Sequence, residues 1–103
     1  MEGMELISFK IISAVGASRS LYIEAIQEAK KKNFNRAYQL IEEGAQVFKE
    51  AHHAHGELIQ KEATGEKTQI DLLLMHAEDQ LMSTDGFRII SEEFIEVYKS
   101  LNK

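Results

Sequence analysis

The chain has no cysteine, no proline and no tryptophan among its 103 residues. Without cysteine, a disulfide scaffold and thiolate chemistry are excluded, and the composition is compatible with a cytoplasmic protein. No uninterrupted apolar run approaches the roughly 20 residues that span a bilayer, and the acidic start Met1–Glu5 is unlike a secretory signal. We therefore expect no membrane insertion. The net charge of −5 argues against nucleic acid as the main partner.

The pattern of apolar residues predicts a single helical domain. Hydrophobic residues make up 44% and charged residues 28%, as in globular proteins. A chain of this length supports one core, so we expect one domain over residues 1–103. The period-two alternation of strands is missing, and apolar residues recur at helical spacing throughout. The predicted fold class is all-α.

Two breaks divide the chain into three long helices. At Lys32–Asn35, a basic helix end is followed by an asparagine suited to an N-cap. After the second helix, Gly65 fits the position just past a helix end, and Thr68 with Asp71 fits a capping box.

Short turns at these breaks predict an antiparallel up-down-up bundle. The helices are expected over about residues 4–32, 35–63 and 68–101. The second helix has one broad apolar stripe, which is typical of a bundle core. The second half of the third helix repeats that spacing. It is also predicted to face the core, through Phe87, Ile90, Phe94, Val97 and Leu101.

The first half of the third helix is apolar on two faces. One line contains Ile70, Leu74, Ala77 and Leu81, and the other contains Leu72, Met75, Asp79, Met82, Gly86 and Ile89. A helix with two apolar faces needs two partners, which a lone three-helix bundle does not provide. We therefore expect the second line to be a contact between subunits of a homo-oligomer; the alternative is a monomer with an apolar patch.

Asp79 lies in the middle of this second line, where a lone buried carboxylate is costly. In a cyclic oligomer whose axis runs along the line, copies of Asp79 would meet. A hard divalent ion such as Mg²⁺ would suit the resulting set of oxygen ligands. The alternative is a polar residue that only fixes register and oligomeric state.

His76 stands one turn before an acid and a carboxamide, Asp79 and Gln80. Both can reach toward its ring, fix the tautomer and leave one nitrogen lone pair free. A neutral imidazole of this kind can accept a phosphoryl group. The alternative is a structural histidine in an amphipathic helix. Glu78 is expected to point away from both neighbours and to be solvated.

Three further histidines, His52, His53 and His55, cluster in the second helix. His52 and His55 share a face and would form a zinc site if an acid or another histidine completed the shell. The favoured interpretation is that His52 or His55 lines the same cleft as His76, because antiparallel helices place them at comparable distances from the turn.

Several segments resemble one bacterial family. These are Ala17–Ser20, Glu50–His52, Glu62–Glu66 and the heptad His76–Met82. Together they resemble the enzyme IIA component of the lactose/cellobiose (chitobiose) class of the phosphoenolpyruvate-dependent sugar phosphotransferase system, from about residue 4 to the C-terminus.

The resemblance implies a cytoplasmic phosphotransferase component that forms a homotrimer with a nine-helix bundle. It implies that His76 takes phosphate from the phosphocarrier HPr and hands it to a IIB component, for uptake of a β-disaccharide of cellobiose, chitobiose or lactose type. It also implies that Asp79 faces the threefold axis and holds a metal ion, and that Gln80 neighbours the phosphohistidine. The competing hypothesis is a non-catalytic regulatory module of the same fold.

The chain departs from the family pattern at two places. His55-Gly56 stands where the family usually has Gln-Thr, which is expected to alter the cleft wall or the environment of the phosphohistidine. Ser83–Phe87 replaces a usually apolar stretch and includes Asp85 and Gly86, a glycine that costs about 1 kcal/mol of helix propensity. We expect the phosphorylation chemistry to be retained, with a trimer that is either closely packed or weakened.

Overall fold

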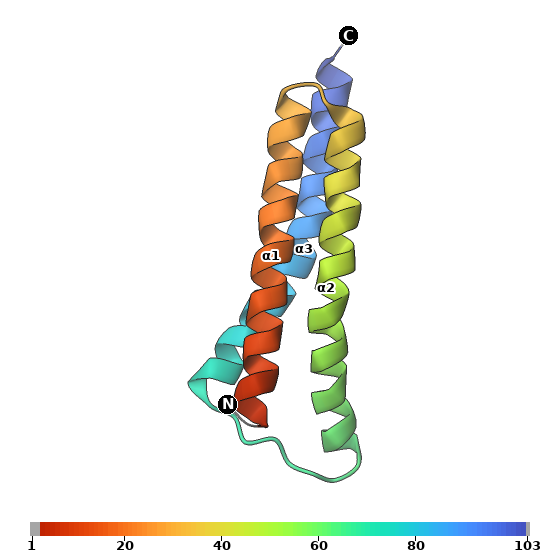
Figure 1. Ribbon diagram of the computed structural model, residues 1–103. Coiled ribbons are helices and arrows are strands. Elements are labelled where there is room, and N and C mark those ends of the chain that lie inside the picture. The colour runs from red at the N-terminus through yellow and green to blue at the C-terminus, as the bar shows by residue number, and fades with distance from the viewer. Residues whose placement is uncertain (1–2, 103) are drawn as a thin grey trace.

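The computed structural model describes residues 3–102, and every regular element in that range is a helix. The helices are α1 (Met4–Lys30), α2 (Phe34–Ala63) and α3 (Leu72–Leu101). They run up, down and up along a rod that measures 56 × 23 × 20 Å (Figure 1). The predicted all-α, antiparallel three-helix arrangement is confirmed.

The turn between α1 and α2 ends the first helix two residues earlier than predicted. Lys32 adopts a left-handed φ of 69°, and the Asn33 N–H donates back to the Glu28 carbonyl at 2.9 Å. This pattern is a Schellman cap. The Asn33 side chain donates to the Glu28 carboxylate at 3.0 Å instead of capping α2. That hydrogen bond, together with the nearby Lys31 ammonium, holds the pKa of Glu28 below its usual value.

The connection between α2 and α3 is longer than the predicted short turn. Gly65 takes a φ of 95° and ends α2 as expected, with the Glu66 N–H bonded to the Lys61 carbonyl at 3.0 Å. The capping box starting at Thr68 is wrong. A box needs the longer Glu or Gln at its third helical position; here Asp71 is itself the N-cap and accepts from the Leu74 N–H at 2.8 Å. The linker 64–71 therefore passes beneath the bundle before α3 begins (Figure 1).

The core consists of two clusters stacked along the rod. The lower cluster is built around Ile11, Val15, Leu58, Leu74 and Leu81. The upper cluster is built around Tyr22, Leu40, Ile41 and Ile95. The predicted stripe of α2 supplies its share of both clusters, with buried Ala37, Leu40, Ile41, Gly44, Ala51, Ala54 and Leu58.

The second half of α3 packs on a different face from the one predicted. Four of the five residues assigned to the core are exposed: Ile90 by 50%, Phe94 by 45%, Val97 by 50% and Leu101 by 72%. The buried positions are Thr84, Ser91 and Ile95. Because both series have helical spacing, spacing alone does not choose between them. The small hydroxyl residues face the neighbouring helices, and the larger apolar ones face outward.

The first helix has an apolar composition as a whole. Although the sequence lacks an uninterrupted apolar run of membrane-spanning length, α1 is long and apolar enough to cross a membrane by length and composition. In the bundle, Ile11, Val15 and Tyr22 of α1 are almost completely buried against the other helices. Such burial of one face is typical of the core helix of a helical bundle.

Helices α1 and α2 approach closely at Gly44. The Ser18 hydroxyl of α1 donates to the Gly44 carbonyl at 2.8 Å, and the Tyr22 ring lies directly over the glycine. Burial raises the pKa of the Tyr22 hydroxyl above its ordinary value of 10.0. Because the pKa is raised on folding, this group stabilises the protein below pH about 10, and the contribution is lost as the pH rises further.

We expect Gly44→Ala to destabilise the bundle. The new Cβ would lie 2.5 Å from Tyr22 Cε1 and 2.9 Å from Cδ1, and the buried ring has little room to move. Overpacking of this kind costs about 1–3 kcal/mol of the free energy of unfolding. Denaturant unfolding measures the loss.

The matched control is Gly56→Ala in the same helix, where a Cβ would meet nothing within 4 Å. This substitution should stabilise the helix by roughly 0.5–1 kcal/mol. Equal stability of the two variants would contradict the close approach of Tyr22 to Gly44.

Candidate functional site

His76 lies in the second turn of α3 with its side chain exposed to solvent. Its neighbour Ala77 is fully buried and faces the core. Within residues 3–102, no hydrogen bond or ion pair joins the His76 ring to Asp79, Gln80 or another side chain. In a single chain the ring is therefore accessible, and the tautomer-fixing contacts suggested by the spacing are not formed.

Asp79 is exposed as well, one turn further along α3. In the described part of the chain, no three His, Cys, Asp or Glu side chains gather closely enough to hold a metal ion. One chain thus contributes at most a partial ligand set at Asp79. The predicted zinc alternative, built on His52 and His55, also lacks its third ligand within this range.

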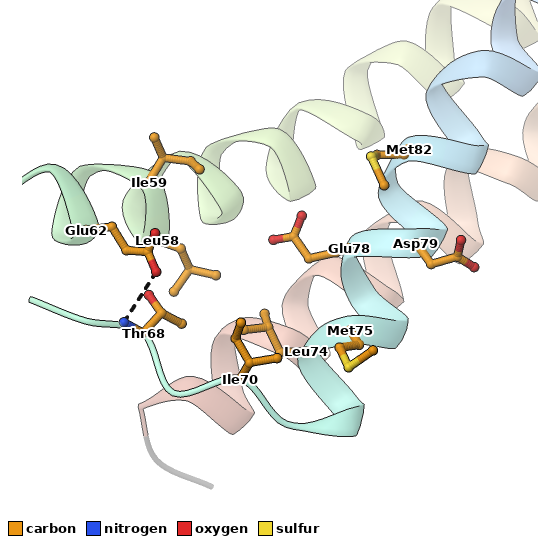
Figure 2. Close-up of a pocket in the computed structure, with 10 residues that line it drawn as sticks. All are labelled: Leu58, Ile59, Glu62, Thr68, Ile70, Leu74, Met75, Glu78, Asp79 and Met82. Atoms are coloured by element: carbon orange, nitrogen blue, oxygen red, sulfur yellow. Dashed lines mark hydrogen bonds between the residues drawn. The ribbon is translucent and has the colours of Figure 1, made fainter.

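A largely apolar pocket of about 330 Å³ lies between the end of α2, the linker and the start of α3 (Figure 2). Its apolar wall is formed by Leu58, Ile59, Ile70, Leu74, Met75 and Met82. Its polar residues are Glu62, Thr68, Glu78 and Asp79, and the Thr68 N–H donates to the Glu62 carboxylate at 3.4 Å. The pocket extends to the side of α3 that carries Met75, Asp79 and Met82, but it does not include His76.

Glu78 points toward α2, as Figure 2 shows, and bonds to it. Its Oε2 lies 2.8 Å from Nε2 of His55, with the two side chains 34% and 23% exposed. The prediction that Glu78 is simply solvated is wrong. Its position two residues from His76 places it about 160° away around the helix, on the side where α2 lies.

This contact also bears on the predicted cleft. His55 reaches α3 through Glu78, on the opposite side of the helix from His76, and His52 is exposed. Neither histidine is therefore brought to His76 within one chain. Equal distance from a turn sets the height of a residue along the bundle, but it does not set the angle at which that residue faces a neighbouring helix.

The sequence also did not predict a contact from α1 on the flank of α3 that carries His76. Arg19 donates to the Ser83 hydroxyl at 3.3 Å. Ser83 lies two helical turns after His76, at nearly the same angle around α3. The segment Ala17–Ser20 thus contains Ser18, which packs against α2, and Arg19, whose guanidinium contacts α3.

The outward face of α3 is mainly apolar along its length, with Asp79 in its middle. Leu72, Met75, Met82 and Ile89 are exposed, as the predicted second line requires of a single chain. At about 100° per residue, Ile90 and Val97 lie within about 20° of Asp79 around the helix, and Phe94 lies about 60° from it. The residues wrongly assigned to the core are therefore the continuation of that line, and we call the whole surface the outward face of α3.

Comparison with known proteins places the chain in a family. The family model described as "PTS system, Lactose/Cellobiose specific IIA subunit" matches residues 6–99. The lichenan-specific phosphotransferase enzyme IIA component of Bacillus subtilis (strain 168) is 40% identical over 102 residues, which cover 99% of this chain and 93% of that protein.

Solved structures agree. The crystal structure of the cellobiose-specific enzyme IIA from Bacillus anthracis superposes with a TM-score of 0.94 at 40% identity, covering 99% of this chain and 94% of that one. The chitobiose IIA of Escherichia coli, solved in solution as a complex with HPr, gives a TM-score of 0.85 at 29% identity, with both chains fully covered. From its helices, its motif and these relatives, the chain belongs to the lactose/cellobiose-specific IIA family of the sugar phosphotransferase system and is a phosphoryl carrier of that system.

Proposed function

We propose that His76 is the residue that carries the phosphoryl group, taking it from phosphorylated HPr and passing it to a IIB component. The observation that carries the proposal is the exposed imidazole in the second turn of α3, within the heptad His76–Met82. Exposure matters because the ring must meet two other proteins in turn. The Escherichia coli relative was solved in complex with HPr, which supports HPr as the donor.

The chemistry needs little beyond position. One lone pair of the neutral ring attacks phosphorus while the bond from phosphorus to the donor breaks in line with it. The phosphoryl group then leaves by the same route toward the acceptor. Gln80, half-buried and one turn after His76, has a carboxamide N–H₂ that can donate to the phosphate oxygens.

We also propose that three chains assemble through the outward face of α3 into a nine-helix bundle. Burying this face would satisfy the second apolar surface of the helix. A threefold axis along the face would bring three copies of Asp79 together. Three carboxylates form an oxygen-only set that suits Mg²⁺ and would neutralise their mutual repulsion; in a single chain only one of them is available.

The transported sugar is proposed to be a β-linked disaccharide of cellobiose, chitobiose or lactose type. The relatives compared above are named for lichenan, cellobiose and chitobiose, which supports a sugar of this general type. A carrier that exchanges phosphate with HPr would work in the cytoplasm, at the inner face of the sugar permease.

Incubation with phosphoenolpyruvate, enzyme I and HPr should add one acid-labile phosphoryl group to the protein, because the exposed His76 ring is accessible to the donor. Intact-mass spectrometry measures the gain. His76→Ala should abolish it, and His52→Ala, a change at an exposed histidine of α2, should leave it unchanged. A folded wild-type protein that takes no phosphate would favour the regulatory module instead.

Analytical ultracentrifugation should show a trimer whose assembly depends on the outward face of α3. Phe94→Asp should yield monomers, because it places a charge in the buried contact. Ile23→Asp on α1 is the matched control: Ile23 is 44% exposed and Phe94 45%, so we expect a single chain to tolerate both changes to a similar extent. Dissociation by both variants, or by neither, would be evidence against this face.

Asp79→Leu should give a trimer at least as tight as that of the wild type, because a cluster of like charges is removed from the axis. Sedimentation with and without a chelator tests this prediction. Chelation should loosen the wild-type trimer and leave the variant unaffected. Monomers of Asp79→Leu would instead show that the carboxylate is required for assembly.

A further inference from the structure

We propose that His55 and Glu78 form a positioning pair that fixes the turn of α3 carrying His76 against α2. The inference rests on the proposed role of His76. The imidazole Nε2 and the carboxylate Oε2 are 2.8 Å apart, within hydrogen-bonding distance, and both side chains are largely shielded from solvent. Either an imidazolium or a neutral ring protonated at Nε2 donates across this distance.

The pair bridges a poorly packed junction. At this end of the rod, a pocket of about 330 Å³ separates parts of α2 and α3, and the apolar side chains Ile59, Ile70 and Met75 at its edge are exposed. The non-helical linker 64–71 does not clamp the start of α3 as a tight turn would.

Polar side-chain contacts between α2 and α3 within the described range occur at two levels only. One is His55–Glu78. The other lies near the far end of the rod, where the Tyr38 hydroxyl bonds to Glu96 and the Lys99 ammonium lies over the Tyr38 ring. The first half of α3 therefore has a single polar attachment to α2.

Electrostatics makes His55 the determining member of the pair. The polar residues of the pocket include three carboxylates, those of Glu62, Glu78 and Asp79. Without His55, Glu78 would share this pocket with the Glu62 carboxylate, would have no hydrogen-bond donor opposite it, and would turn out to solvent. The neighbouring His53 does not substitute for it, because its Nε2 lies 3.6 Å from Glu57 on the outer side of α2.

The position of Glu78 links this attachment to the site. Glu78 lies about 160° around α3 from His76, so holding Glu78 against α2 adds to the core contacts of Leu74 and Ala77 in fixing the rotation of the helix about its own axis. That rotation sets the direction in which the His76 ring faces. Neither His55 nor Glu78 reaches the phosphate; both act through the orientation of α3. A glutamine in place of His55 would keep an N–H donor at this position.

Transfer kinetics from phosphorylated HPr test the pair. His55→Leu and Glu78→Leu should each lower the kcat of transfer by about 10- to 100-fold, the cost of misplacing a reacting group. The KM for phosphorylated HPr should stay unchanged, because the pair lies on the far side of α3 from His76. His55→Gln should retain most of the rate. The double swap His55→Glu with Glu78→His should recover most of what either single change loses.

The matched control is His53→Leu, which breaks an exposed ion pair within α2 and should leave kcat unchanged. Unchanged kcat in His55→Leu, or a fall no larger than that of His53→Leu, would overturn the proposal. A rise in KM with constant kcat would also overturn it, because that result would place the pair in the docking surface.

Nuclear magnetic resonance of the unphosphorylated protein provides a readout that does not depend on transfer. The His76 ring resonances should shift in His55→Leu and Glu78→Leu and stay in place in His53→Leu. Constant resonances would overturn the pair even if transfer proceeds. If the wild-type protein takes no phosphate but the His76 resonances still shift in His55→Leu and Glu78→Leu, the pair is supported and His76 is rejected as the carrier. The failure of one proposal is therefore distinguishable from the failure of the other.

Discussion

The two apolar faces of α3 set the main constraint on this molecule. One face, with Leu74, Ala77 and Leu81, is buried against α1 and α2 in the lower core. The other extends from Leu72 to Leu101 and has no partner among residues 3–102. Because apolar surface is costly to expose, the proposed trimer follows from this face more directly than from any single residue, and Asp79 acquires its proposed role only from its place upon it.

Much of the fold was predictable because the local signals were strong. The apolar stripe of α2 is continuous, and Gly65 ends that helix at the predicted position with a positive φ. The start of α3 was predicted too early, at Thr68, because Thr68 and Asp71 were interpreted as a capping box; Asp71, directly before the apolar run, forms the cap itself. The core face of its second half was also missed. Hydrophobicity favours Phe94, whereas close packing selects Thr84 and Ser91.

The candidate site was likewise predictable from the sequence only in part. The heptad beginning at His76 identifies the chemistry from sequence, because residue types and spacing are properties of one helix. The bond between His55 and Glu78 depends on how α2 is rotated relative to α3, and no local pattern specifies that rotation. His55 was visible in the sequence as one of three clustered histidines, but its partner was visible only in three dimensions.

The buried hydroxyl residues of α3 have a thermodynamic consequence. Thr84 and Ser91 are completely buried, and the Thr84 hydroxyl has no hydrogen-bond partner among the described residues. This layer therefore adds less apolar burial than a leucine layer would. For a chain that assembles through its outward face, a larger share of the stability then comes from association. By mass action, the melting temperature would rise with protein concentration, so dilution alone would weaken the fold.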